Sequence, residues 1–394
     1  MPALKSKKAR LGFIGTGVFI NSTHLLTASQ SPFMEIRAIA DLNEMQLAKH
    51  QAEKKVGYTT TNYHELLNDN RIDIIVIGTK QDLHATMIIE ALDAGKWVFC
   101  EKPMCETTEE EAEVLAAEQR NPGRLAIGFN RRFAPAYVKA LQIFNHLPRP
   151  WLINYRCQCT GHAKHTVNSF YYNRPHIIFE GCHILDLASY MFGETPKRVF
   201  MSGDPLHNNC VIMEYADGSQ FSLMLTSVGS VCMWKEYMEM FAEGAAITIS
   251  EFTDMRIRGI PGEFDMLFNP RFDEHAEELQ RWGFDFYEMF TNNDLIHGDM
   301  QFVPENYMLP WEQVRRPERA LQFDISQYPI RDHQEIFAVQ PDKGWKASFE
   351  HFVNAFLEGK IPYNADGKAG KLANDLGFAL IKSAERKESL LFNG

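Results

Sequence analysis

The chain has 394 residues, of which 45% are hydrophobic and 23% are charged, and its formal net charge is -11. This composition is ordinary for a globular protein, the length allows two domains with separate cores, and the negative charge argues against nucleic acids and anionic membranes as partners. No apolar run reaches the roughly 20 residues of a membrane-spanning helix. The seven cysteines are scattered and odd in number, which favours a cytoplasmic protein with reduced thiols.

The first third of the chain alternates strand-like and helix-like segments. Apolar runs predict strands at 9–14, 34–40, 74–77, 97–100 and 125–128, and helical patterns cover 18–30, 43–55, 83–94 and 107–119. Strands that alternate with helices form parallel sheets with helices on both faces. We therefore predict an α/β fold of the Rossmann, dinucleotide-binding kind for residues 1–128.

After residue 128 the pattern changes to runs of strands. Helices are predicted at 134–144, 181–192, 346–357 and 368–387, and strands at 151–160, 197–202, 209–215, 219–226, 236–243 and 245–250. The pairs Asp217-Gly218 and Glu243-Gly244 are typical of hairpin turns. This succession predicts a second, α+β domain over residues 129–394, with a large and mostly antiparallel sheet that serves substrate binding and oligomerisation. Residues from about 260 to 340 show no pattern that assigns them.

A glycine turn follows the first predicted strand. Gly15-Thr16-Gly17 opens the next helix, where backbone without side chains lets a pyrophosphate approach the helix N-terminus. The third small residue of the dinucleotide fingerprint is missing, because Ile20 stands there, and a plain turn between strand and helix is the alternative.

The second predicted strand ends at Asp41. An acidic residue about 20 positions beyond the glycines binds the hydroxyls of the adenosine ribose in dinucleotide folds, although here it can also cap the following helix. Its carboxylate would repel a 2′-phosphate, and the next residues, Leu42 and Asn43, include no arginine to accept one. The sequence therefore predicts NAD rather than NADP.

The strand at 97–100 runs directly into Glu101-Lys102-Pro103. Strand ends in such a fold face the cofactor crevice. A lysine placed there can donate a hydrogen bond to a substrate hydroxyl and stabilise the charge of a developing alkoxide. The alternative is a solvated lysine at the end of a strand.

A second polar group stands at the start of the helix predicted at 181–192. His183 and Asp186 are three positions apart and so share one face of that helix. An imidazole titrates near neutral pH and is suited to removing the proton of a secondary alcohol, and Asp186 could orient it. A helix-capping or core histidine is the alternative.

The loop from 157 to 176 concentrates cysteine, histidine, tyrosine and arginine residues. Rings that stack on a sugar and polar groups that read its hydroxyls suit a carbohydrate site. The spacing Cys-x-Cys-x-x-His-x-x-His, from Cys157 to His165, would also permit a zinc site, but it is not that of a familiar zinc module. An ordinary surface loop is the third possibility.

Together these motifs resemble those of the Gfo/Idh/MocA family, the oxidoreductases of the glucose–fructose oxidoreductase and inositol dehydrogenase type. The resemblance covers nearly the whole chain, and its most specific part is the Glu-Lys-Pro corner at its distance from the glycine turn. Further matching segments are 15–17, 79–84, 128–133, 183–186 and 342–344. One departure concerns position 179, because inositol dehydrogenases usually have an Asp four residues before the histidine, where this chain has Phe179 followed by Glu180.

The resemblance and the motifs together assign three sets of site residues. The catalytic set is Lys102, His183 and Asp186. The residues expected to bind the cofactor are Gly15, Thr16, Gly17, Val18, Phe19, Asp41, Thr79, His84, Glu101, Lys102 and Asn130. The residues expected to bind the substrate are Arg131, His162, His165, Tyr172, Arg174, Phe179 and Glu180. No metal site is predicted.

The function expected from these sets is that of an NAD-dependent dehydrogenase, which moves a hydride between nicotinamide and a secondary alcohol of a sugar, sugar derivative or cyclic polyol. One alternative is a glycosidase that oxidises its sugar transiently, eliminates the aglycone, adds water and reduces again. Another is a non-catalytic NAD-binding sensor. The resemblance also implies a homodimer or homotetramer that pairs through the open face of the second sheet.

Overall fold

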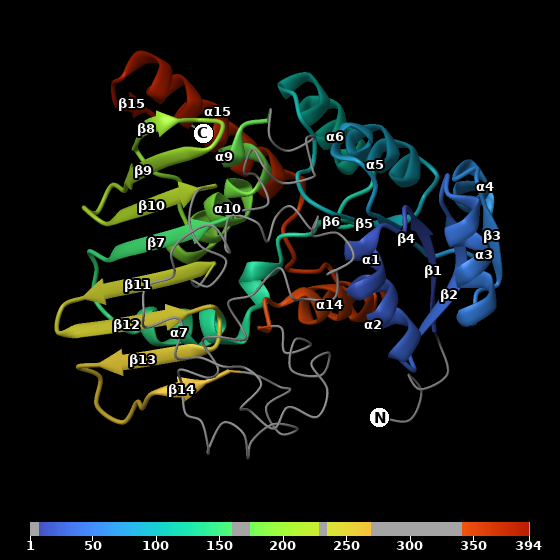
Figure 1. The fold of residues 1–394 in the computed structure, drawn as a ribbon, viewed down its shortest axis with the longest axis horizontal. Helices are drawn as coiled ribbons and strands as arrows, with labels where there is room; N and C mark the ends of the chain where they lie inside the picture. Colours follow the sequence, from blue (N-terminus) through green and yellow to red (C-terminus); the bar gives the residue numbers. More distant parts are fainter. Residues whose placement is uncertain (1–7, 160–173, 228–234, 269–340, 394) are drawn as a thin grey trace, which may run out of the picture.

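The computed structural model describes residues 8–159, 174–227, 235–268 and 341–393. Two sheets make up most of this structure, one formed by the first third of the chain and one by the later part (Figure 1). The first sheet is entirely parallel, and the second is mixed but mostly antiparallel. The predicted fold class is confirmed.

The first sheet has six strands in the order β3-β2-β1-β4-β5-β6. They are β1 (Ala9–Ile14), β2 (Met34–Ala40), β3 (Tyr58–Thr60), β4 (Ile74–Ile77), β5 (Trp97–Cys100) and β6 (Leu125–Ile127). All residues of β4 are buried, as its unbroken run of β-branched side chains requires for a strand covered on both faces. The strand order reverses beside β1, and ligands of such sheets bind beyond the carboxyl ends of the strands at this point.

Helices cover both faces of this sheet (Figure 1). One face packs against α4 (His64–Asn68), α5 (His84–Asp93) and α6 (Thr108–Arg120). The other face packs against α2 (His24–Gln30), α3 (Glu44–Glu53) and α14 (Trp345–Glu358). Thr107 caps α6, because its hydroxyl accepts from the Glu110 amide at 3.2 Å while the Glu110 carboxylate accepts from the Thr107 amide at 3.1 Å.

Two local predictions in this domain differ from the structure. The helix expected over 18–30 is interrupted at Thr23, which has non-helical angles and whose hydroxyl donates to the Phe19 carbonyl, so that α1 (Val18–Ser22) and α2 are separate. The elements β3 and α4 were not predicted, because three and five residues are too few to show a period.

The second sheet has nine strands in the order β14-β13-β12-β11-β7-β10-β9-β8-β15. They are β7 (Leu152–Gln158), β8 (Arg198–Asp204), β9 (Asn208–Glu214), β10 (Gln220–Thr226), β11 (Glu236–Ala242), β12 (Ala245–Ser250), β13 (Asp254–Arg258), β14 (Met266–Leu267) and β15 (Leu390–Leu391). Only the pair β7–β10 is parallel. The predicted hairpin turns are confirmed, with Gly218 at a φ of 86° between β9 and β10 and Gly244 at 71° between β11 and β12.

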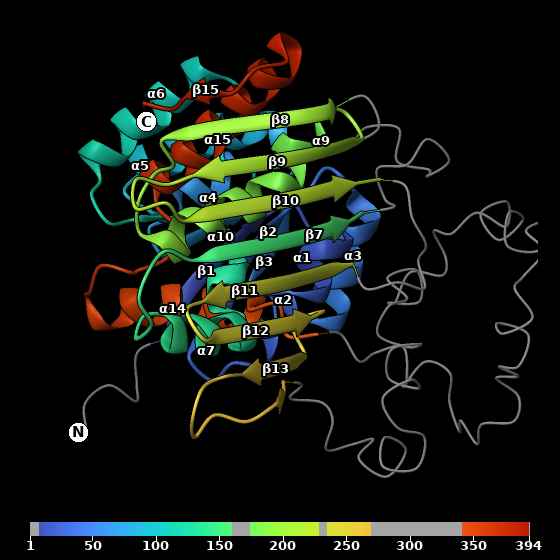
Figure 2. The ribbon, with the colours of Figure 1, turned by 90° about the vertical axis from the view of Figure 1, so that its left-hand side faces the viewer.

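Helices cover one face of the second sheet. They are α7 (Pro135–Phe144), α9 (His176–Phe179), α10 (Gly181–Phe192) and α15 (Gly367–Arg386), and their apolar sides share one core with the inward residues of the strands. No helix of the described residues lies on the opposite face, which is open in Figure 2. The half-exposed Leu152, Ile212, Met224 and Phe241 are spread over this open face.

The chain returns to the first sheet near its end. Phe349, Phe352 and Val353 of α14 are fully buried in the core that also contains β1, β4 and β5. The first sheet is therefore covered in part by residues from beyond 340, while the proposed division of the chain at 128/129 stays a prediction. Among the described helices, none combines the length and the apolar character that crossing a membrane requires.

Candidate active site

The glycine turn lies at the carboxyl end of β1. Gly15 has a φ of 83°, and a Cβ on it would stand 2.6 Å from the carbonyl oxygen of Gly78, so only glycine fits. A Cβ on Gly17 would meet no protein atom within 4 Å, which leaves open space for a ligand. Ile20, which replaces the third fingerprint glycine, is accommodated because Gly78 at the end of β4 has no side chain: a Cβ there would be 2.1 Å from Ile20.

Asp41 follows β2 and reaches the same turn. Its Oδ2 accepts from the Thr16 amide at 2.7 Å and from the Thr16 hydroxyl at 2.8 Å, and its Oδ1 accepts from the Asn43 amide at 2.9 Å. Asn43, rather than Asp41, caps α3 with its side chain. The carboxylate therefore fixes the glycine turn and remains partly exposed beside it.

The loops after β4 and β5 are joined by His84. Its Nδ1 lies 2.8 Å from the Pro103 carbonyl oxygen and its Nε2 lies 3.3 Å from the Thr79 carbonyl oxygen. Burial lowers the pKa of this imidazole below its usual value. Glu101, one of the expected cofactor residues, pairs instead with His24 of α2 at 2.6 Å and is buried.

Lys102 extends from the loop after β5 to the start of the helices of the second domain. Its Nζ donates to the Phe179 carbonyl at 2.9 Å and lies 3.9 Å from Glu180 Oε2, while 19% of its side chain is exposed. The Phe179 carbonyl is available because α9 ends there and α10 begins at Gly181. Lys102 therefore lies beside the segment that leads into the helix of His183.

Glu180 occupies the break between α9 and α10, and it is buried. Its carboxylate lies 3.3 Å from Arg131 Nη2 and 3.3 Å from Lys235 Nζ, in addition to Lys102. Burial by itself raises the pKa of Glu180, but the charges of Lys235, Lys102 and Arg131 outweigh it and hold this pKa well below the usual value. The carboxylate is ionised at neutral pH.

His183 lies one turn further along α10 and is 6% exposed. Its Nδ1 has no hydrogen-bond partner among the described residues, and the ring of Phe129 lies edge-on at 6.0 Å. Burial, followed by the charges of Arg131 and Lys102, lowers the pKa of His183 well below 6.5. The imidazole is therefore neutral at neutral pH and has the form of a base.

Asp186 does not orient His183 as the sequence analysis expected. Its carboxylate is held by Arg132, with Nε to Oδ2 at 2.8 Å and Nη2 to Oδ1 at 2.5 Å, and is buried. A guanidinium binds a carboxylate through two parallel hydrogen bonds and so occupies both of its oxygens. Asp186 joins α10 to the 3₁₀ turn Asn130–Phe133, which the sequence spacing of three residues could not reveal.

Arg131 lies inside a charged network that was not predicted, instead of on the crevice surface. It binds Glu236 through Nε at 2.6 Å and through Nη2 at 2.7 Å, and the hydroxyl of Tyr155 donates to the same carboxylate at 2.5 Å. Lys343 lies 3.7 Å from Glu236 and 3.0 Å from Glu251. Despite burial, these cations lower the pKa of Glu236 to about 2.

A sequence signal for this network did exist. Glu236, Met238 and Met240 alternate on one side of β11 and all face the core. A glutamate at a core-facing position of a strand needs a buried partner of opposite charge. The alternation of Glu236 with the two methionines could therefore have identified it as a member of a buried ion pair. Asn130, predicted near the cofactor, belongs to the same region, since its Nδ2 donates to the Lys343 carbonyl at 2.6 Å.

The expected substrate loop is described only at its two ends. Arg174 pairs with Glu106 and lies 5.1 Å over the ring of Phe179, which is buried in the core of the second domain. His162, His165 and Tyr172 lie outside the described residues.

Three potential metal ligands lie close together among the described residues. Cys157, Glu180 and Glu236 place one ligand atom each within 4.8 Å of one another. Arg131, Lys235 and Lys343 already neutralise the two carboxylates, and burial raises the pKa of the Cys157 thiol. A divalent cation would thus compete with three fixed positive charges, and this donor set does not suit one.

The chain is similar in sequence to known oxidoreductases. Residues 9–129 match the family described as "Oxidoreductase family, NAD-binding Rossmann fold". The chain is 27% identical to the uncharacterised oxidoreductase YrbE of Bacillus subtilis over 70% of this chain and 86% of that protein. It is 25% identical to the myo-inositol 2-dehydrogenase of Thermotoga maritima over 97% of this chain and 98% of that protein.

A solved structure shares the fold over almost the whole length. It is the scyllo-inositol dehydrogenase of Lactobacillus casei with bound NAD(H) and scyllo-inositol, with a TM-score of 0.68 and 15% identity. The match covers 98% of this chain and 99% of that chain. At this identity the likeness concerns the fold.

Proposed function

The chain belongs to the Gfo/Idh/MocA oxidoreductase family, and from that premise we propose that it is an NAD-dependent dehydrogenase of a sugar, sugar derivative or cyclic polyol. The observation that carries this proposal is the placement of Lys102, at the carboxyl end of β5, against the segment that leads into the helix of the neutral His183. The inositol dehydrogenases among the relatives support a ring with secondary hydroxyls as the substrate class.

The cofactor site fits NAD by its shape and charge. Gly15 and Gly17 leave the backbone open to a pyrophosphate, and Asp41 would accept hydrogen bonds from the adenosine ribose. When bound, NAD would supply the acceptor for the hydride of the alcohol carbon. The residues of the chain have to orient the alcohol, remove its proton and exclude water.

His183 and Lys102 have different roles toward the hydroxyl group of the substrate. The neutral imidazole would take the hydroxyl proton, since its low pKa leaves a nitrogen lone pair available. The Lys102 ammonium would stabilise the negative charge that develops on the same oxygen. The pKa of His183 is low partly because of the Lys102 charge, so the two groups act on each other as well as on the substrate.

Asp41 is expected to set the choice between the two nicotinamide cofactors. Asp41→Asn keeps the size of the side chain and removes its charge, so the preference of kcat/KM for NAD over NADP should fall roughly 10-fold or more. Steady-state kinetics with both cofactors measure it. Glu35→Gln, an exposed change on β2, serves as the matched control. A wild-type preference for NADP would contradict the proposal.

The pH dependence follows from His183. Its pKa lies well below 6.5, so the base form persists as the pH falls through the range in which an ordinary histidine becomes protonated. We expect the acid limb of kcat/KM for alcohol oxidation to lie below pH 6.5, the ordinary pKa of a histidine. A profile with its acid limb at or above 6.5 would contradict the role of the buried imidazole.

The decisive experiment presents purified protein and NAD with free sugars, inositols and aryl glycosides, and records NADH absorbance and aglycone release together. Stoichiometric NADH from a sugar or polyol is the expected result. Aglycone release without net NADH would instead identify the oxidation–elimination glycosidase. Binding of NAD with neither signal across the panel would favour the sensor.

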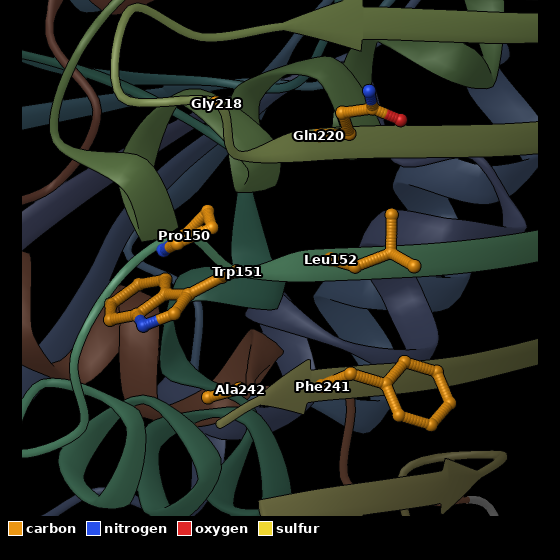
Figure 3. Close-up of a pocket in the computed structure, with 7 residues that line it drawn as sticks. All are labelled: Pro150, Trp151, Leu152, Gly218, Gln220, Phe241 and Ala242. Carbon is orange, nitrogen blue, oxygen red and sulfur yellow. The ribbon is translucent and has the colours of Figure 1, made fainter. Parts of the chain in front are cut away.

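The open face of the second sheet is the proposed interface between copies of the chain. Leu152 and Phe241 project from neighbouring strands beside a pocket of about 220 Å³ at the end of β7 opposite Cys157 (Figure 3). Leu152 and Phe241 are paired across β7 and β11, and adjoining exposed apolar side chains of this kind are typical of a surface that another subunit covers. Light scattering at micromolar concentration is expected to show a dimer or tetramer, which Phe241→Glu should weaken; a wild-type monomer would refute the interface.

A further inference from the structure

Glu180 stands where the family pattern is broken. The acidic residue that inositol dehydrogenases usually carry four positions before the histidine is Phe179 here, and Phe179 is buried in the apolar core. A regular helix would turn the next residue away from the site. In this chain the helix is interrupted at Glu180, between α9 and α10, and the interruption brings its carboxylate toward Lys102.

The surroundings of Glu180 define what its carboxylate can do. Oε1 lies 3.3 Å from both Arg131 and Lys235, and Oε2 lies 3.9 Å from Lys102. Arg131 is itself held by two hydrogen bonds to the buried Glu236. The contact with Arg131 therefore fixes the position of the Glu180 carboxylate. A carboxylate bound by three cations acts as a counter-ion and does not serve as a proton donor.

We propose that Glu180 is the positioning residue of this site, which holds the Lys102 ammonium charged and in place beside His183. The Phe179 carbonyl and the Glu180 carboxylate bind the same Nζ from consecutive residues, so the helix break supplies both contacts at once. This role differs from the substrate contact that the sequence suggested for Glu180. Its effect on turnover rests on the proposed dehydrogenase function, whereas its effect on Lys102 does not.

The first test needs no substrate. In the purified full-length protein, acetylation of Lys102 by acetic anhydride is followed by mass spectrometry of the peptide that contains it. Loss of an opposite charge within about 4–6 Å favours the neutral amine, so Glu180→Gln should raise the rate of Lys102 acetylation roughly 10-fold. The exposed Lys346 is the internal control and should react at an unchanged rate.

Glu180→Asp is the conservative partner, because it keeps a charge at the same backbone position. Its acetylation rate should lie between those of the wild type and Glu180→Gln. Equal Lys102 rates in the wild type and in both variants would overturn the proposal, whatever the activity of the protein. Circular dichroism checks that each variant is folded, and Glu180→Asp decides the outcome if Glu180→Gln does not fold.

The second test is a double-mutant cycle on turnover. Glu180→Gln should lower kcat roughly 10-fold with little change in the KM of the alcohol, and it should have almost no effect once Lys102 is already alanine. Because the Glu180 charge raises the pKa of His183, its removal should also move the acid limb of kcat/KM to lower pH. A rise in KM alone, independent of Lys102, would mean that Glu180 contacts the substrate and would overturn the proposal.

The two tests separate the possible failures. Wild-type protein without hydride transfer to any alcohol would refute the proposed function, while the acetylation rates would still decide whether Glu180 holds Lys102. Normal turnover with equal acetylation rates would refute only the role of Glu180.

Discussion

Lys102→Ala is expected to lower kcat for alcohol oxidation by about 10²–10⁴-fold, the range typical of a lost group that acts on the proton and charge of a reacting hydroxyl. The ammonium follows the carboxyl end of β5 and lies against the segment that leads into the His183 helix. Its removal leaves the developing oxyanion without a fixed positive charge. Initial rates of NADH formation measure the loss.

Two control measurements test whether the loss of kcat in Lys102→Ala is specific to catalysis. NAD affinity, measured by titration, should change little, because the glycine turn and Asp41 do not depend on Lys102. Lys346→Ala removes an exposed lysine elsewhere and should leave kcat unchanged. Retention of most of the wild-type kcat in Lys102→Ala would refute the catalytic role of Lys102.

Glu236→Gln is expected to destabilise the fold by about 3–5 kcal/mol, since it leaves Arg131 buried with much of its charge uncompensated. The wild-type carboxylate accepts two hydrogen bonds from Arg131 and one from Tyr155, and it is fully buried. Denaturant unfolding monitored by circular dichroism measures the change. A loss below about 1 kcal/mol, the scale of one neutral hydrogen bond, would contradict the charged network.

The Glu236 carboxylate is also expected to make the stability of the fold depend on pH. The pKa of Glu236 is about 2 in the folded protein and near 4.5 when unperturbed. As pH falls below 4.5 the unfolded chain binds the proton first, so the wild type loses this part of its stability between those values. Glu236→Gln should lack that component. Glu239→Gln on the outward side of the same strand is the matched control, with an expected change within about 0.5 kcal/mol.

Prediction from sequence worked best where the signal was local. The alternation of strands and helices and the hairpin turns at Gly218 and Gly244 each depend on residues within a few positions of one another. Helix and strand periods need several residues to become visible, which is why β3 and α4 were missed.

The site was predictable only in part, because its contacts join distant positions. Lys102 and His183 stand in recognisable motifs, yet Arg131 binds Glu236 from 105 positions away. The partner of Asp186 is Arg132, 54 positions earlier, and the spacing to His183 gave no indication of it. The break between α9 and α10, which turns the Glu180 side chain toward Lys102, likewise depends on tertiary packing. The spacing between Glu180 and His183 in the sequence does not indicate it.

The position of α14 has a consequence for the order in which the protein can be completed on the ribosome. Phe349, Phe352 and Val353 fill one face of a sheet whose strands all precede residue 128. That face stays without its final cover while more than 200 further residues are synthesised. During synthesis, one apolar face of the first sheet therefore stays partly exposed and accessible to chaperones until α14 has been synthesised and packs on it.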